Sequence, residues 1–359
     1  MKLSIGIVGL PNVGKSTLFN ALLKRQVALE ANYPFATIEP NVGIIEVPDE
    51  RLQKLAEIVK TQKIVPAAVE FYDIAGLVKG ASQGEGLGNQ FLTHIREVAA
   101  ILHVVRLFED KDIIHVENKV DPLSDVQTIE TELILADLQT LQKQKEPKGT
   151  SAPKEAFAAY EVVKKLKNHL DSGKSARTLS LHVEERDAIK PLNLITMKPV
   201  VFCFNCSLEQ LEKPEETKAQ INVILNEVKN LAKRSAGSLD HARDDAEQTN
   251  FIIFNPLEET TLNVLIQKAY ETLGLISFLT AGEKEARAWT ITKGTMAPQA
   301  AGTIHTDFEK KFIKADVATF EDFVACNGWT GAREKGKVLI CGKDHEMKDG
   351  DVVEFKIGS

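Results

Sequence analysis

The chain has 359 residues, of which 43% are hydrophobic and 26% are charged, so it can bury a large core and is long enough for two or three domains. Its formal net charge of −7 argues against a protein that coats nucleic acid through bulk electrostatics, so an RNA partner must be met by a local patch. The apolar run at residues 3–8 is far shorter than a membrane span and leads straight into a glycine-rich loop, so we expect no membrane segment.

Four cysteines are scattered along the chain. They are too few to staple a protein of this length, which indicates a reducing, cytoplasmic compartment. Cys203 and Cys206 form a C-x2-C pair. No second pair lies at the spacing of a zinc finger, so ordinary buried thiols are a better interpretation than a zinc or redox site.

Alternating strands and helices are predicted from the first residues to about residue 278. Strand-like apolar runs occur at 3–9, 42–47, 68–72, 101–108, 199–204 and 251–254. Helical patterns occur at 15–25, 88–99, 125–145 and 259–273. This alternation predicts an α/β fold with three layers around a mainly parallel sheet, the architecture of a P-loop nucleotide-binding domain.

Two segments depart from this alternation. Residues 125–195 are polar and helical with a break at 147–153, which predicts two helices in an inserted α-helical hairpin arm. After about residue 279, short strands are predicted at 287–292, 312–317, 337–340 and 351–357, around one short helix at 319–325. The expected domains are a nucleotide-binding domain at 1–124 and 196–278, the arm at 125–195, and a small β-rich domain at 279–359.

A phosphate-binding motif follows the first strand-like run. Residues 9–16 read Gly-Leu-Pro-Asn-Val-Gly-Lys-Ser, which matches G-x4-G-K-[ST] between a strand and a helix. Glycines at 9 and 14 allow backbone N–H groups to face phosphate oxygens, and the start of the helix adds its positive dipole. We expect nucleotide contacts from Asn12, Val13, Gly14, Lys15, Ser16 and Thr17, with Lys15 bridging the β- and γ-phosphates and also serving catalysis.

A magnesium ion is needed to neutralise a bound triphosphate, and the sequence offers three candidate ligands. The Ser16 hydroxyl is placed to bind the ion. Asp73 begins the tetrad Asp-Ile-Ala-Gly that follows the run at 68–72, and we expect it to hold Mg²⁺ through water. Gly76 ends that tetrad and is expected to contact the γ-phosphate through its amide. Thr37 is the candidate from the first switch segment.

Catalysis is predicted to be slow. Leu77 occupies the place after the tetrad where a water-orienting glutamine would stand, and an apolar side chain cannot polarise water. The orienting group must therefore come from the glycine-rich run 80–88, from His115, or from a partner.

Two strand ends compete for recognition of the base. Asn118-Lys119-Val120-Asp121 matches the guanine motif N-K-x-D and, taken alone, predicts a GTPase. A parallel crossover needs about a dozen or more residues, and only the short stretch 109–117 separates this motif from the run at 101–108. The motif is therefore a poor candidate for the end of the next parallel strand.

The run at 199–204 ends instead in Asn205, with Cys206 beside it as a further nucleotide contact. The fourth position of this motif is Leu208, which cannot accept hydrogen bonds from guanine as a carboxylate would, and Glu209 lies one place too far along. An asparagine amide can pair with N7 and the 6-amino group of adenine. This interpretation favours ATP as the substrate, with GTP still possible.

Several longer motifs resemble those of one family, the Obg-like ATPase (YchF) family. They are the segments at 9–17, 32–41, 73–82, 84–89, 287–290 and 297–309. The resemblance implies a G-domain interrupted by a helical arm and followed by a C-terminal TGS domain of ubiquitin-like β-grasp shape. It also implies a preference for ATP over GTP, and association with the ribosome or its large subunit through the arm and the TGS domain.

The resemblance bears on single residues as well. In that family a histidine in the segment matched by residues 113–116 has been proposed to act in hydrolysis, which implies a catalytic role for His115. The family usually carries Asn-x-x-Glu as its base-reading motif, whereas Leu208 stands in the fourth place here. This departure leaves the nucleotide preference open.

Three classes of function remain at this stage. The first is a Mg²⁺-dependent ATPase, acting as a cytoplasmic monomer, whose hydrolysis resets switch segments at 32–41 and 73–90. The second is a binding module in which nucleotide occupancy alone positions the arm and TGS domain on a ribosome or another partner, with negligible turnover; Leu77 keeps this alternative open. A metabolic P-loop kinase is the third, and the switch-type tetrad at Asp73 argues against it.

Overall fold

The computed structural model describes residues 3–25, 41–74, 87–109, 120–147, 153–234 and 251–358, and for 87–90 and 229–234 the backbone alone. The chain divides into two compact units. The first contains the described residues of Met1–Ala21, Glu39–Val42 and Phe71–Leu262, and the second those of Leu22–Ile38, Gly43–Glu70 and Asn263–Ser359. No helix of the described residues is long and apolar enough to cross a membrane.

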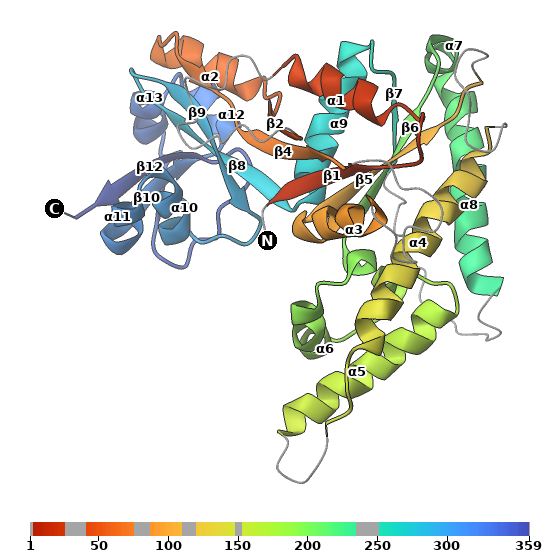
Figure 1. Cartoon of the computed structure of the whole chain (residues 1–359). Helices are drawn as coiled ribbons and strands as arrows, with labels where there is room; N and C mark the ends of the chain where they lie inside the picture. Colours follow the sequence, from red (N-terminus) through yellow and green to blue (C-terminus); the bar gives the residue numbers. More distant parts are fainter. Residues whose placement is uncertain are drawn as a thin grey trace. The chain divides into compact units, whose positions relative to one another are not determined.

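One of the two sheets has six strands (Figure 1). Its strand order is β2 (Val42–Glu46), β4 (Ala68–Asp73), β1 (Ser4–Val8), β5 (Ala100–Arg106), β6 (Val200–Asn205) and β7 (Phe251–Phe254). From β1 to β7 neighbouring strands are parallel. All residues of β1 and β5 are buried, which explains their continuous apolar sequence, since strands in the middle of a parallel sheet are covered on both faces.

The helices that belong with these strands are α1 (Lys15–Leu23), α3 (Leu87–Glu97), α4 (Pro122–Gln142), α5 (Lys154–Asp171), α6 (Val183–Ile189), α7 (Leu208–Glu212), α8 (Pro214–Arg234) and α9 (Glu259–Thr272). Three single turns of 3-10 helix, Ala176–Thr178, Lys190–Leu192 and Ile195–Met197, connect α5 to β6. One face of the sheet is covered by α4 and α8, because Val126 of α4 and Ile221 of α8 pack against Val105 and Phe204. The predicted α/β layering is present.

The helical arm is formed by α4 and α5, which lie side by side and extend away from the sheet (Figure 1). Leu141 of α4 and Leu166 and Leu170 of α5 belong to one buried cluster. The first helix begins earlier than predicted, at Pro122, because the carboxylate of Asp121 accepts a hydrogen bond from the N–H of Ser124 and caps it. The arm therefore has its own small core.

The second unit contains a mixed sheet in the order β11 (Leu339–Cys341), β10 (Phe312–Ala318), β12 (Val352–Ile357), β8 (Leu275–Ala281), β9 (Ala286–Thr292) and β3 (Ile64–Val65). Its helices are α2 (Arg51–Val59), α10 (Ala297–Ile304), α11 (Thr306–Lys310), α12 (Phe320–Ala325) and α13 (Trp329–Glu334). The hairpin β8–β9 and the pair β10–β12 are antiparallel, whereas β12 and β8 are parallel. With α10 between β9 and β10, this is the β-grasp arrangement that the resemblance implied.

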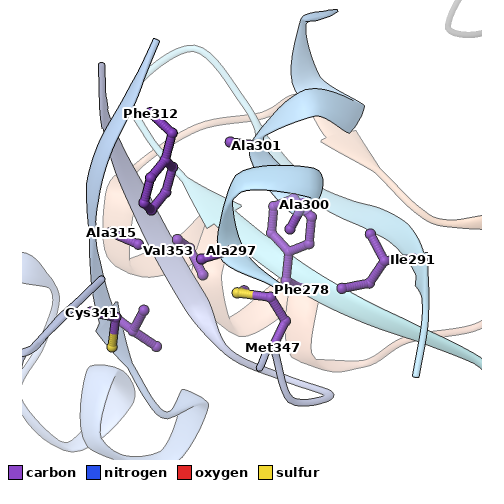
Figure 2. Packing of buried hydrophobic residues seen from close by; sticks show 11 residues of the cluster. Phe278, Ile291, Ala297, Ala300, Ala301, Phe312, Ala315, Cys341, Met347 and Val353 are labelled. Atoms are coloured by element: carbon purple, nitrogen blue, oxygen red, sulfur yellow. The ribbon is translucent and has the colours of Figure 1, made fainter. Parts of the chain in front are cut away.

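The core of this unit lies between the sheet and α10 (Figure 2). Phe278, Phe312 and Val353 of the strands pack against Ala297 and Ala300 of the helix. The prediction of one short helix after residue 279 was wrong, because α10, α11 and α13 lie there besides α12. The buried face of α10 consists of alanines, so its helical period is not marked by large apolar residues.

Candidate nucleotide-binding site

The loop between β1 and α1 has a conformation that only glycine allows at two positions. Gly9 has φ of 156° and Gly14 has φ of 103°, where other residues are strained. A Cβ atom on Gly9 would lie 2.5 Å from the carbonyl oxygen of Val104, and one on Gly14 would collide with the side-chain nitrogen of Asn205. The loop is therefore packed directly against the ends of β5 and β6.

Lys15 lies inside this loop with only 7% of its surface exposed. Its Nζ atom donates a hydrogen bond of 2.7 Å to the carbonyl of Leu10. Burial lowers the pKa of the Lys15 ammonium to about 8, although the nearby charge of Asp73 acts in the opposite direction. A desolvated cation at the start of a helix is poised to receive an anionic ligand.

Asp73 ends β4 and lies close enough to Lys15 for their charges to interact. Burial raises the pKa of the Asp73 carboxyl, and the Lys15 charge lowers it in part. The backbone holds this strand end in place, because the N–H of Asp73 donates to the carbonyl of Asn41 (3.0 Å) and that of Ile74 donates to Ile7 of β1 (3.3 Å). The carboxylate therefore stands beside the phosphate loop.

The phosphate loop and the start of α1 carry three further polar side chains beside the buried Lys15. Asn12, Ser16 and Thr17 are exposed, whereas Val13 is buried. The described residues contain no cluster of three or more histidine, cysteine or acidic side chains that could hold a metal on their own. Mg²⁺ suits the residues that are present, because it takes oxygen ligands, usually one or two from the protein together with phosphates and waters.

Three predicted site residues, Thr37, Gly76 and His115, lie outside the described residues, as does Leu77. The structure therefore places the phosphate loop, Asp73 and the end of β6 together. The roles assigned to the other residues stay predictions.

At the end of β6, Asn205 is 5% exposed and donates from its side-chain nitrogen to the carbonyl of Val13 (3.1 Å). Cys206 is buried, and its backbone N–H donates to Phe254 of β7 (2.9 Å). Leu208 is half exposed and begins α7. The neighbouring Glu209 pairs with Lys213 at 3.4 Å on the surface. Asn205 is thus joined to the phosphate loop, and the Glu209 carboxylate is engaged elsewhere.

The rival motif at residues 118–121 falls partly outside the described residues. Its described residues are Val120 and Asp121, and Asp121 caps α4. On the side away from β1, the parallel neighbour of β5 is β6, with Arg106 opposite Asn205. Cys203 and Cys206 are free and buried, and burial raises the pKa of both thiols, which suits structural rather than reactive cysteines.

Arg106 and Asn255 also lie at this edge and were missed by the sequence analysis. Arg106 is 1% exposed, donates from Nε to the carbonyl of Phe108 (2.9 Å), and stacks over that ring at 4.7 Å. Its two terminal nitrogens have no hydrogen-bond partner within the described part of the chain. Asn255 donates to the carbonyl of Cys206 (2.8 Å). An arginine at the end of a mostly apolar strand was the available signal for the first.

A phosphate loop opening a helix, a carboxylate at the end of one strand and an asparagine at the end of a further parallel strand define a P-loop nucleotide-binding protein of the GTPase-like class. Two family models match. The one described as "50S ribosome-binding GTPase" covers residues 4–137, and YchF-GTPase_C, described as "Protein of unknown function (DUF933)", covers 275–358.

Relatives match over nearly the whole chain. The "Ribosome-binding ATPase YchF" of Bacillus subtilis (strain 168) is 45% identical over 372 residues, and that of Escherichia coli O157:H7 is 49% identical over 370 residues, each with 99% of both chains covered. The solved "Structure of the Schizosaccharomyces pombe YchF GTPase" is 36% identical with a TM-score of 0.79, over 98% of this chain and 97% of that one. The chain belongs to the YchF family, which confirms the resemblance noted in its motifs.

Proposed function

We propose that this protein is an ATPase that binds ribosomes, as the names of its bacterial relatives state for them. The observation that carries the proposal is the loop between β1 and α1, where Gly14 lies against Asn205 and the buried Lys15 ammonium contacts the Leu10 carbonyl. Loops of this kind hold the phosphates of nucleoside triphosphates through backbone N–H groups and the positive end of a helix.

In this proposal the residues at 12–17 surround the phosphates. Lys15 exchanges its bond to the Leu10 carbonyl for contacts with the β- and γ-phosphates. Ser16 and Thr37 would hold Mg²⁺, with Asp73 acting through water. When bound, the metal neutralises charge on the triphosphate. The amide of Gly76 is proposed to contact the γ-phosphate and so to respond to hydrolysis.

We propose that Asn205 selects adenine. One N–H of its amide is bound to Val13, which leaves one donor and one acceptor for the base. This pair matches N7 and the 6-amino group of adenine, whereas guanine presents two acceptors at the same edge. The exposed Leu208 and the surface pairing of Glu209 with Lys213 also favour ATP, because no carboxylate from these positions is directed at a guanine.

Slow turnover is part of the proposal, because Leu77 cannot orient water and His115 is its suggested substitute. The second candidate is a GTPase, which the names of one family model and of the Schizosaccharomyces pombe structure favour. A nucleotide-gated binding module with negligible hydrolysis is the third. All three use the same phosphate loop, so they differ only in the nucleotide base that is bound and in the rate of hydrolysis.

A contact network supports communication between the site and the arm. Arg96 at the end of α3 donates to the carbonyl of Ala136 (3.3 Å) and the hydroxyl of Thr140 (2.9 Å), both on α4. The buried Lys198 donates to the carbonyl of Arg96 (2.8 Å) and so caps α3. Since α3 begins within the predicted switch segment 73–90, we propose that a change there reaches the arm.

Calorimetry of slowly hydrolysed ATP and GTP analogues with Mg²⁺ tests the nucleotide. Tighter binding of the ATP analogue is expected, and Asn205→Ala should remove most of the difference, whereas the surface variant Glu209→Ala should keep it. A clear preference of the parent chain for the GTP analogue would overturn the assignment to ATP. Release of phosphate, abolished in Lys15→Ala, separates an enzyme from a binding module.

Co-sedimentation with purified ribosomes and with separated large subunits tests the partner. We propose binding to the large subunit by a cytoplasmic monomer through the arm and the TGS domain. Pelleting that depends on nucleotide is the expected result. Absence of the protein from the pellet in every nucleotide state and at low salt would remove the partner from the proposal.

A further inference from the structure

The sheet of the second unit has an open edge in its middle. Strands β12 and β8 pair at a single position, Val352 with Leu279. Because β8 ends at Ala281, the last residues of β12, from Phe355 to Ile357, have no residue of β8 opposite them. Within the described residues the other side of β12 is paired with β10 along its whole length.

The direction of the backbone groups follows from two hydrogen bonds. The carbonyl of Asp351 accepts from Leu279 and so points toward β8 (2.7 Å), whereas the N–H of Gly358 donates to Lys311 on the opposite side (2.8 Å). Backbone groups of successive residues in a strand point to opposite edges. The N–H and C=O groups of Phe355 and Ile357 therefore face the open side, where they can pair with another strand.

A cavity of about 600 Å³ lies at this open edge. It is bounded by the end of β8 and the β8–β9 turn, residues 280–285, and by Val353, Glu354 and Phe355 of β12. Ile304 and Phe308 line it from the α10 side, and Phe355 packs against the same core cluster, to which Val353 belongs. The cavity therefore adjoins both the free backbone groups and an apolar wall.

The opposite face of the sheet supplies a different wall. Trp329 and Arg333 of α13 line the same cavity, and Arg333 lies over the Trp329 ring at 5.3 Å while it pairs with Glu354 at 2.5 Å. A cavity with lining residues on both faces of a sheet and a strand edge between them offers a place for an added strand. Side chains of an added strand would alternate between the two walls.

We propose that this cleft binds an extended polypeptide segment of a protein partner, which adds a strand to β12 and carries apolar residues at every second position. The apolar side chains contact Ile304, Phe308 and Phe355, and the intervening ones contact Trp329 and Arg333. A row of free backbone N–H and C=O groups matches a polypeptide strand, and nucleic acid has no such row of groups. The charged residues that line the cavity are of both signs, Glu283, Glu285 and Glu354 with Lys284 and Arg333. The inference does not depend on the proposed ATPase activity.

Selection from a random-peptide display library on the full-length chain, without nucleotide, tests the proposal. Enriched peptides are expected to alternate apolar and polar residues and to lose binding at least about tenfold in Phe308→Glu, measured by fluorescence anisotropy. Ile340→Glu is the matched control, because Ile340 is 71% exposed on β11, the outer edge of the same sheet. It should leave binding unchanged.

Hydrogen exchange on the unmodified chain gives a readout that does not depend on a variant. The amides of Phe355 and Ile357 should become protected when a selected peptide is added. Failure to enrich any peptide, equal binding by Phe308→Glu, or unchanged exchange at these two amides would overturn the proposal. Loss of binding in Ile340→Glu alone would place the site on the other edge. Displacement of the peptides by a single-stranded RNA oligomer would mark the cleft as a nucleic-acid surface.

Discussion

Binding of a triphosphate should raise the pKa of Lys15 and take up a proton. In the nucleotide-free protein burial lowers the pKa of this ammonium to about 8, against the opposing charge of Asp73. Phosphate oxygens stabilise the charged form, which returns the pKa to its ordinary value of about 10.4 or higher. Because the ligand binds the charged form, a lysine that is neutral in the free protein must first be protonated.

The size of the effect follows from the titration of this one group. With a pKa of about 8, roughly half of the Lys15 side chains are neutral at pH 8 and about nine tenths at pH 9, so binding takes up about 0.5 and about 0.9 proton. The affinity should stay nearly constant below about pH 7 and fall about tenfold between pH 7 and pH 9.

Calorimetry of a slowly hydrolysed ATP analogue with Mg²⁺, in buffers of different ionisation enthalpy, measures both quantities. Lys15→Arg is the matched control, since its guanidinium stays charged throughout this range, and its weaker binding should show no proton uptake. Constant affinity of the parent chain from pH 7 to pH 9, without proton uptake, would refute the reasoning that the free loop holds a desolvated lysine.

Three further substitutions test the packing around the site. Gly14→Ala directs a methyl group into the Asn205 amide at a residue with φ of 103°. Backbone strain and the displaced hydrogen bond should cost about 2–4 kcal/mol, so the nucleotide affinity measured by calorimetry should fall about thirtyfold or more. The control Gly342→Ala, whose added methyl group meets no atom within 4 Å, should leave the affinity unchanged. Arg106→Met removes a charge whose terminal nitrogens have no partner among the described residues, so the Tm of the nucleotide-free protein should rise by about 2–4 °C per kcal/mol gained; a lower Tm would mean that the charge is paired. The Asp137 carboxylate accepts hydrogen bonds from the N–H groups of Ile195 (2.9 Å) and Thr196 (2.7 Å). Asp137→Ala leaves both N–H groups without an acceptor, which should lower the free energy of unfolding in urea by about 3–5 kcal/mol. A change below about 1 kcal/mol would contradict the importance of this buried carboxylate.

Much of the first sheet could be predicted because its signals are local. The strand at 251–254 was found at the predicted bounds, and the runs that became β1, β5 and β6 differ from their predictions by one or two residues. Continuous apolar runs between turn residues specify buried parallel strands without knowledge of their neighbours. The loop at 9–16 was equally readable, because its glycines and the start of α1 act over a few residues.

Other helices and strands are marked only weakly in the sequence. The buried face of α10 is made of alanines, and α8, whose run at 214–234 is mostly exposed where its side chains are described, was not predicted at all. The strand β8 was missed because it directly follows the helix predicted at 259–273. In each of these elements the tertiary packing, rather than a strong local period, decides the structure.

The sequence by itself determined that this chain has a phosphate loop, a parallel sheet and the motifs of the YchF family, since these depend on neighbouring residues. Only the tertiary structure decided that the amide of Asn205 donates to the carbonyl of Val13, 192 residues away in the sequence, that Arg106 is buried, and that β12 extends beyond the end of β8. The reason is that burial sets the energy of a charge or hydrogen bond, and burial depends on which distant segments come together.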